Sequence, residues 1–320
     1  MNYGLQVMGT TRHRVSFVAP TFVSSGIAQA GVTAGAITLN TTTATLLVAA
    51  QNCNSGGTYG DFWDDPGLSQ MTITALTSIS ANVSATYTMN SYAGGAGNAL
   101  VGRSVWITGM TSANNNSHGF GAGYAAKITA SSTTSFTVAI ANTGGMSTAA
   151  GQTGTGVVGN TWTQAISLAL GGSANQNIGY CSLPLVGSSH VFNASGNAFE
   201  GSCPVYAFAG GSPGGWQVDS KNSGAITGSS NAFTTSTLTL HNTEKEIMFA
   251  AIANNNFAPT SIVSMSNSYT GAVNNGHSFA NEAGGAAYLI AQAATSGTVF
   301  TFNNGGSSAA CQVIAAFRKI

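Results

Sequence analysis

The densest group of acidic residues in the chain surrounds two aromatic rings. Asp61, Asp64 and Asp65 flank Phe62 and Trp63. Carboxylate oxygens are the ligands that Ca²⁺ prefers in proteins, and the face of a tryptophan can stack on a sugar ring. The segment could therefore form a calcium site or a glycan-binding loop. The alternative is a solvated loop that ends in an Asp-Pro turn.

A second tryptophan lies in a stretch rich in glycine and proline. Trp216 follows two glycines, and Asp219 comes shortly after it. An aromatic ring in such a loop is available to a sugar or to another subunit. We therefore predict that any glycan contact uses Trp63 with its three neighbouring aspartates, and in second place Trp216 with Asp219.

No set of residues points to catalysis. Gly210–Gly214 fits the G-x-S-x-G pattern of hydrolases, but a nucleophile elbow needs a following helix, and Pro213 continues the turn instead. The other acidic residues are scattered, whereas a glycosidase needs two carboxylates at one sugar bond. The sequence predicts a protein that is not an enzyme and that has no cofactor, apart from the Ca²⁺ considered above. A carboxylate pair assembled across loops is the alternative.

The chain is unusually poor in charge. Charged residues make up 5% of the 320 residues, and eight basic side chains balance eight acidic ones. So few cations cannot form the basic stripe that nucleic acid requires, and no apolar run is long enough to span a bilayer. A nearly neutral surface is weakly protected against self-association. We therefore expect a homo-oligomer.

The N-terminal residues have neither an apolar core segment nor a cleavage site of a signal peptide. We expect the protein to be made in the cytoplasm without Sec export, and export by another route or release by lysis are the alternatives. Cys203 and Cys311 occupy matching positions in two similar strands, which favours buried free thiols. Disulfide pairing of the four cysteines is the alternative.

Short apolar runs alternate with Gly, Asn and Ser clusters along the whole chain, as in β-sandwiches and barrels. Several of these runs recur, which indicates a duplicated unit. Trp162 matches Tyr269. At an offset of 108 residues, Tyr180, Phe192 and Ala207 match Tyr288, Phe300 and Ala315. The recurring stretches are Ile37–Leu39 with Leu46–Ala50 and, 201 residues later, Leu238–Leu240 with Ile247–Ala251; and Asn160–Ala165 with, 107 residues later, Asn267–Ala272.

The offset between the copies falls from 201 to 107, so the first copy contains 94 residues that the second lacks. The sequence therefore predicts an all-β fold, a duplicated antiparallel β-sandwich of jelly-roll or immunoglobulin-like type with a small inserted β module. The predicted parts are an N-terminal arm at 1–15, a body at 16–74 and 158–320 with copies at about 37–74 plus 158–211 and at 238–320, and the inserted module at 75–157.

The Leu46–Ala50 strand, the Gly159–Gln164 stretch and the Val205–Gly210 strand resemble β-sandwich modules of bacteriophage tail and virion-surface proteins. The resemblance implies a virion structural protein that is made in the host cytoplasm and lies at the surface of the particle, such as a tail fibre, commonly a trimer, a tail tip or a capsid decoration. It implies other virion proteins as partners and, frequently, host-surface carbohydrate. The alternatives are a secreted glycan-binding adhesin and a polysaccharide depolymerase.

Overall fold

The computed structural model describes residues 18–30, 35–54, 61–68, 70–117, 125–170, 174–195, 201–227, 232–240, 244–254, 262–271, 277–279, 282–291, 297–302 and 309–320. The predicted arm at 1–15 lies outside them. Within the described residues the regular structure consists of β-strands and two short 3-10 helices. The prediction of an all-β sandwich fold is confirmed.

One half of the body, which we call the first sandwich, has a five-stranded sheet facing a three-stranded sheet. The strand orders are β1-β14-β3-β12-β11 and β2-β13-β4, and neighbouring strands run antiparallel. The strands are β1 (Val18–Ala30), β2 (Gly35–Leu39), β3 (Leu46–Asn54), β4 (Asp61–Asp65), β11 (Thr163–Ala169), β12 (Ala174–Ser182), β13 (His190–Ser195) and β14 (Gly201–Gly211).

The other half, the second sandwich, repeats that arrangement. Its sheets have the orders β15-β22-β17-β20-β19 and β16-β21-β18. The bridge between Thr270 and Tyr288 matches the pairing of Thr163 with Tyr180 in the first sandwich. The strands are β15 (Trp216–Thr227), β16 (Ala232–Thr234), β17 (Glu246–Asn254), β18 (Ile262–Met265), β19 (His277–Phe279), β20 (Glu282–Ala291), β21 (Val299–Phe302) and β22 (Ala309–Lys319).

The strand order identifies each sandwich as a jelly roll rather than an immunoglobulin-like fold. In sequence order within the first sandwich, strands one, eight, three and six are neighbours in one sheet, and strands two, seven and four are neighbours in the other. This order results when two Greek keys wrap around one core. The fifth strand, β11, stays beside its hairpin partner β12.

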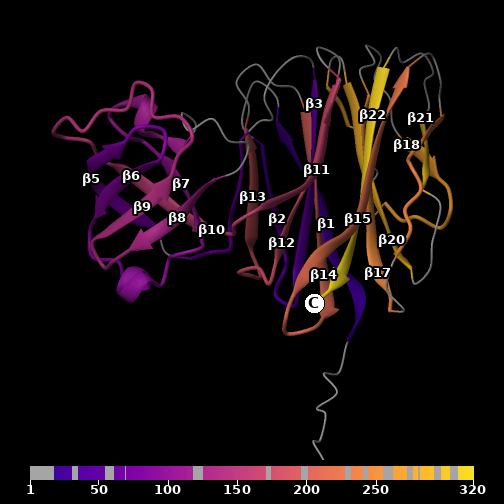
Figure 1. Cartoon of the computed structure of the whole chain (residues 1–320), viewed down its shortest axis with the longest axis horizontal. Helices are drawn as coiled ribbons and strands as arrows, with labels where there is room; N and C mark the ends of the chain where they lie inside the picture. Colours follow the sequence, from indigo (N-terminus) through magenta and orange to yellow (C-terminus); the bar gives the residue numbers. More distant parts are fainter. Residues whose placement is uncertain are drawn as a thin grey trace, which may run out of the picture.

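The two sandwiches pack against each other through their five-stranded sheets (Figure 1). The shared core contains Val48 and Tyr206 from the first sandwich and Phe249 and Val313 from the second. The central strands β3 and β17 are therefore covered on both faces. This explains why both read as continuous apolar runs rather than as alternating ones.

A one-residue shift separates the sequence match from the structural match on one strand. Val48 and Phe249 occupy equivalent positions and pair with Tyr206 and Ala315 respectively, whereas the sequences align Ala207 with Ala315. A shift of one residue turns a strand's side chains to the other face. The prediction that Cys203 and Cys311 are equivalent is therefore wrong.

The two cysteines belong to different cores as a result. Cys203 is buried inside the first sandwich, and Cys311 packs beside Leu168, which belongs to β11 of the first sandwich. Neither of them forms a disulfide, nor does Cys181.

The first two strands of each sandwich correspond at a different offset from the one that the sequence indicates. Phe192 pairs with Ile37, and its equivalent Phe300 pairs with Phe233. The match of Ile37–Leu39 with Leu238–Leu240 is therefore wrong. The same offset makes Phe22 equivalent to Val218, and an irregularity of register follows both residues, before Ser24 and before Ser220.

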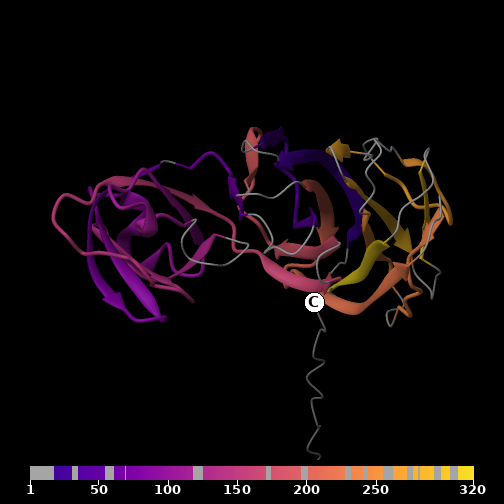
Figure 2. The same cartoon turned by 90° about the horizontal axis from the view of Figure 1, so that it is seen from above.

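The segment between β4 and β11 forms a closed six-stranded barrel with its own core, beside the first sandwich (Figures 1 and 2). Barrel closure leaves no open sheet edge. Its first strand begins at Met71 and its last strand ends at Gly159, so the barrel extends a few residues beyond the predicted module at 75–157. The strands are β5 (Met71–Ser80), β6 (Ser84–Met89), β7 (Ser104–Thr108), β8 (Ala126–Ser131), β9 (Ser135–Ala139) and β10 (Gly154–Gly159), with 3-10 helices at Ala93–Asn98 and Ala113–Asn115.

Candidate functional site

The acidic segment singled out from the sequence is strand β4, not a loop. Side chains alternate between the two faces of a strand, so Phe62 and Asp64 point into the first sandwich while Trp63 and Asp65 point outward. Phe62 and Asp64 are buried, and Trp63 and Asp65 are half-buried. The side chain of Asp61 lies outside the described part.

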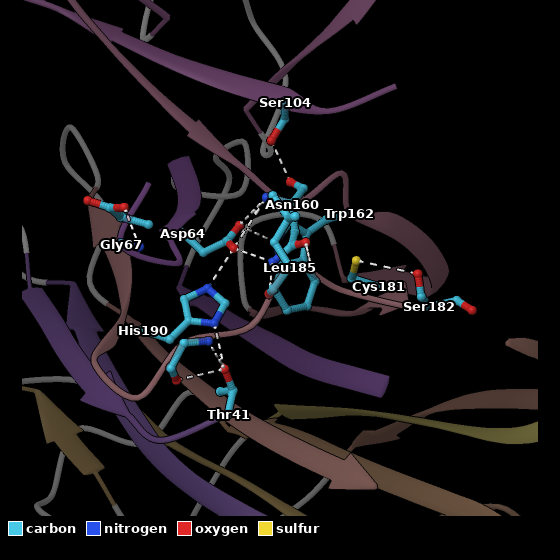
Figure 3. A network of polar contacts seen from close by, with 12 residues as sticks. Thr41, Asp64, Gly67, Ser104, Asn160, Trp162, Cys181, Ser182, Leu185 and His190 are labelled. Carbon is cyan, nitrogen blue, oxygen red and sulfur yellow. Dashed lines mark hydrogen bonds and ion pairs between the residues drawn. The ribbon is translucent and has the colours of Figure 1, made fainter. Parts of the chain in front are cut away.

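Asp64 is the centre of a buried polar network (Figure 3). Its carboxylate accepts hydrogen bonds from the Trp162 indole N–H at 2.9 Å and from the Asn160 side-chain amide at 2.6 Å. The Asn160 backbone N–H donates to the same carboxylate at 3.1 Å. His190 Nε2 lies 2.7 Å from Asp64 Oδ2. A buried carboxylate requires such a set of donors, because burial otherwise disfavours its charge.

His190 extends this network to a hydroxyl group. Its Nδ1 lies 2.9 Å from Thr41 Oγ1, so a hydroxyl, an imidazole and a carboxylate follow one another as in a nucleophilic triad. Thr41, His190 and Asp64 are 0%, 0% and 1% exposed. A hydroxyl without access to solvent cannot reach a substrate. The arrangement can therefore orient and stabilise the chain but cannot serve as an active site in this conformation.

The network lies where the barrel joins the body. Asp64 stands at the end of β4, where the chain leaves for the barrel, and Asn160 stands where it returns. The Asn160 side chain also bonds to Leu185, donating to the carbonyl at 3.0 Å and accepting from the N–H at 2.6 Å. The Ser104 hydroxyl, from barrel strand β7, donates to the carbonyl of Asn160. One buried carboxylate thus fastens both ends of the insertion, and we call this set of residues the junction network.

A glycine allows the two chain segments to approach so closely. A Cβ atom added at Gly159 would overlap the backbone carbonyl of Asp64. Only glycine lacks that atom, so the residue before Asn160 must be glycine for the junction network to close without a shift of the backbone.

Two tryptophans stack outside the junction network. The rings of Trp63 on β4 and Trp106 on β7 are nearly parallel, with centroids 4.1 Å apart. Trp106 is buried, and its indole N–H has no hydrogen-bond partner in the described part of the chain. One face of the Trp63 ring, which the sequence analysis offered to a sugar, is thus covered by a ring of the barrel.

The second predicted glycan contact is also closed to solvent. Trp216 is 2% exposed and belongs to the core between the sandwiches, where its indole N–H donates to Thr45 Oγ1 at 3.1 Å. The carboxylate of Asp219 is almost fully buried and pairs with Arg318 at 3.3 Å. The predictions that Asp64, Trp216 and Asp219 face a sugar from solution are wrong. Aromatic residues near glycines can fill a core as readily as a loop.

Asp65 makes a local turn instead of a ligand site. Its carboxylate accepts a hydrogen bond from the Gly67 N–H at 2.8 Å, as the Asp-Pro turn predicted for this position requires. Among the described residues, no three or more His, Cys, Asp or Glu side chains gather as metal ligands would.

Burial and the nearby carboxylate of Asp64 raise the pKa of the Cys181 thiol, and burial alone raises that of Cys203.

Sequence reasoning missed Thr41, Asn160 and His190 as partners of Asp64. They come from segments far apart in the chain, and no local motif joins them. One signal was present in the repeat. Asp64 matches Met265 of the second copy, so an acidic residue stands where an apolar one fits the same strand.

Comparisons with known proteins do not assign the chain to a family. No family model matches the sequence, and no curated protein matches it significantly. Among solved structures, the crystal structure of the STIV MCP, a viral major capsid protein, is similar over 95% of this chain and 97% of its own. The identity is 8% and the TM-score 0.20; likeness at that level carries no argument. In the described residues no helix is long and apolar enough to cross a membrane.

Proposed function

We propose that this protein is a non-enzymatic structural component of a virus particle of bacteriophage type, exposed at the particle surface. The observation that carries the proposal is the body of two jelly rolls fused through one apolar core. Jelly rolls recur in viral coats and in lectins. A block stabilised in this way presents a fixed outer shape, which a repeating assembly needs.

The sealed junction network supports a structural role over a catalytic one. Thr41, His190 and Asp64 follow one another like the members of a catalytic triad, and all three are inaccessible. Their hydrogen bonds hold the barrel to the body, which is a mechanical task. In the proposed function the barrel is a rigid projecting module of a tail fibre, tail tip or decoration protein.

Contact with neutral host carbohydrate is a second candidate function, and one feature of the barrel favours it. The end of the barrel remote from the junction network contains residues 81–83, 109–117 and 140–153, and none of these is charged. Buried amides hold the loops in place: Asn115 Nδ2 donates to the Ser147 carbonyl and to Gln152 Oε1, both at 2.9 Å. Rigid, uncharged amide and hydroxyl groups suit neutral sugars better than ionic receptors.

Localisation on particles tests the structural proposal. Antibodies against the recombinant chain should label purified particles from the source cells in electron micrographs, and the chain should be abundant in their mass spectra. An antibody against the separated barrel should label the outside of intact particles. Presence in the culture medium without any association with particles would instead favour a secreted adhesin.

A glycan array of neutral and acidic sugars tests the second function with the whole chain. Binding of neutral sugars that is weakened by Asn114→Ala, and unchanged by Thr86→Ala on the barrel wall, would support it. Release of reducing ends from host capsule would contradict the non-enzymatic proposal and favour a depolymerase.

A further inference from the structure

Two aromatic contacts join the sandwiches, and each consists of one tyrosine and one phenylalanine. Tyr180 of the first sandwich lies against Phe317 of the second, with ring centroids 5.2 Å apart. Tyr288 of the second sandwich lies against Phe208 of the first, also with centroids 5.2 Å apart. The tyrosine and the phenylalanine have thus changed sandwiches between the two contacts.

Strand register shows that the residues of the two contacts are equivalent. Tyr180 and Tyr288 pair with equivalent residues of the central strands β3 and β17. Phe208 and Phe317 also pair with equivalent residues, two positions earlier on the same strands. When residue i of one unit meets residue j of the other, and the equivalent of j meets the equivalent of i, the two units are related by a twofold axis. The two sandwiches therefore pack as a symmetric dimer does.

The core between the sandwiches follows the same rule beyond these rings. Positions that one half contributes to this core are matched by equivalent positions of the other half, and all members of the matched pairs are 0% exposed. The pairs are Leu46 with Ile247, Val48 with Phe249, Ala50 with Ala251, Ile178 with Ala286, Tyr206 with Ala315 and Phe208 with Phe317.

The sizes of the side chains differ across the axis, and the differences compensate. Tyr206 of the first sandwich lies against Phe249, with centroids 5.0 Å apart, and its hydroxyl donates to the Ala286 carbonyl at 2.9 Å. At the site related by the axis, Ala315 stands in place of the tyrosine and Ile178 in place of the alanine. A large residue of one sandwich is thus matched by a small one of the other at both sites, which keeps the packing dense.

Each sandwich also has a core of its own between its two sheets. The first sandwich buries Leu47 and Phe192 there, and the second buries Met248 and Ile314. The core shared by the sandwiches is therefore a contact between two units rather than the interior of one. Its described residues are apolar apart from the tyrosine hydroxyls, so a second copy of either face brings no like charge against it and loses apolar area to the contact.

We propose that the chain is a fused twofold dimer of jelly rolls. The five-stranded face of each jelly roll is a self-complementary docking surface, and the partner that it fits is a second jelly roll with the same face. In this chain the turn at 212–215, between β14 and β15, joins the two partners covalently. The inference concerns how the jelly rolls recognise each other, so it goes beyond the proposed function and does not depend on it.

Exchange of the two faces tests the proposal on the whole chain. One variant gives the second sandwich the residues of the first: Phe249→Val, Ala286→Ile and Ala315→Tyr. The other variant gives the first sandwich the residues of the second: Val48→Phe, Ile178→Ala and Tyr206→Ala. The first set places large residues on both sides of each site and the second set places small ones there. Each set alone should therefore lower the melting temperature by at least about 10 °C.

The variant with all six substitutions restores the native pairs on the opposite sides of the axis. Its melting temperature should lie within about 5 °C of the native value, because each set rescues the other. The matched control exchanges Leu47 and Met248, which are equivalent but belong to the separate cores. Leu47→Met and Met248→Leu should have additive effects without rescue.

A six-residue variant that loses as much as the two sets together, or that does not fold, would overturn the twofold relation between the faces. Rescue as strong in the control pair would also overturn it, because the coupling would then not come from the shared face. Labelling of particles decides the proposed function separately.

Discussion

The two sandwiches have the same strand order but differ at the positions that meet the barrel. Asp64, His190 and Trp63 of the first sandwich correspond to Met265, Thr298 and Ser264 of the second. In the second sandwich the chain crosses from Met265 to Asn267 through the single residue Ser266. Polar and aromatic groups thus stand where an insertion must be held, and apolar or small groups stand where none exists.

One residue of the junction network has the same residue type at the equivalent position of the second sandwich. Asn160 and Asn267 are equivalent, and each donates a side-chain hydrogen bond to a backbone carbonyl, of Leu185 and Gly297 respectively. Thr298 bonds to Thr235 without any ionisable group. The asparagine therefore serves the jelly roll itself, whereas the carboxylate and imidazole serve the attachment of the barrel.

The comparison predicts the largest loss of stability for Asp64→Ala. The change removes the buried carboxylate to which His190, Trp162 and the Asn160 backbone N–H are bonded, and we expect a loss of about 3–5 kcal/mol in the free energy of unfolding. Denaturant titration followed by tryptophan fluorescence measures it. Asp65→Ala, on the outer face of the same strand, should lose less than about 1 kcal/mol. Equal losses would show that the inward position of Asp64 has no special role.

Gly159→Ala should have the next largest effect. The new methyl group would overlap the Asp64 carbonyl, so the junction would have to open, at a cost of about 1–3 kcal/mol. Gly156→Ala is the control, because its nearest neighbour is the terminal methyl of Met71 at 3.0 Å, which can move aside. A melting temperature as high as that of the control would contradict the close approach.

Trp63→Ala should loosen the barrel rather than the body. Loss of the stack on Trp106 should cost about 1–2 kcal/mol and expose the junction to proteases. Limited proteolysis followed by mass spectrometry locates the cuts. Ser264→Ala at the equivalent position should change neither stability nor cleavage. Cleavage between β4 and β5 at the native rate would argue against the stack as a support.

Replacing both Asp64 and His190 by the residues of the second sandwich should lower the free energy of unfolding less than removing Asp64 alone. In Asp64→Met with His190→Thr, no imidazole remains unpaired, and we expect a loss under about 2 kcal/mol. Both single variants, measured in the same titrations, complete a double-mutant cycle. Additive losses would mean that the two side chains contribute independently.

Removing the barrel should affect the body least. Joining Asp65 directly to Asn160 reproduces the short connection of the second sandwich, and the barrel core lies entirely within the deleted segment. The shortened chain should melt cooperatively, with a melting temperature within a few degrees of that of the body in the whole chain. Loss of a cooperative transition in calorimetry would contradict this separation.

Much of the architecture follows from the sequence, because burial leaves a local pattern. The apolar runs at Leu46–Ala50 and Ile247–Ala251 mark strands covered on both faces, and the falling offset between the repeats indicates an insertion. Matching residues such as Trp162 and Tyr269 occupy equivalent buried positions. Such features depend on near neighbours and on composition.

Only the tertiary structure decided which of these residues meet. Hydrogen bonds between Asp64, Asn160 and His190 depend on strands brought together from distant parts of the chain, and no local spacing encodes that meeting. Cys203 and Cys311 lie on opposite faces of equivalent strands because the strand register differs by one residue from the sequence match. Sequence similarity alone does not reveal that shift. Trp63 and Trp216 illustrate the same limit. The sequence around a tryptophan does not show whether its ring faces solvent or packs against another side chain, because tertiary packing decides that.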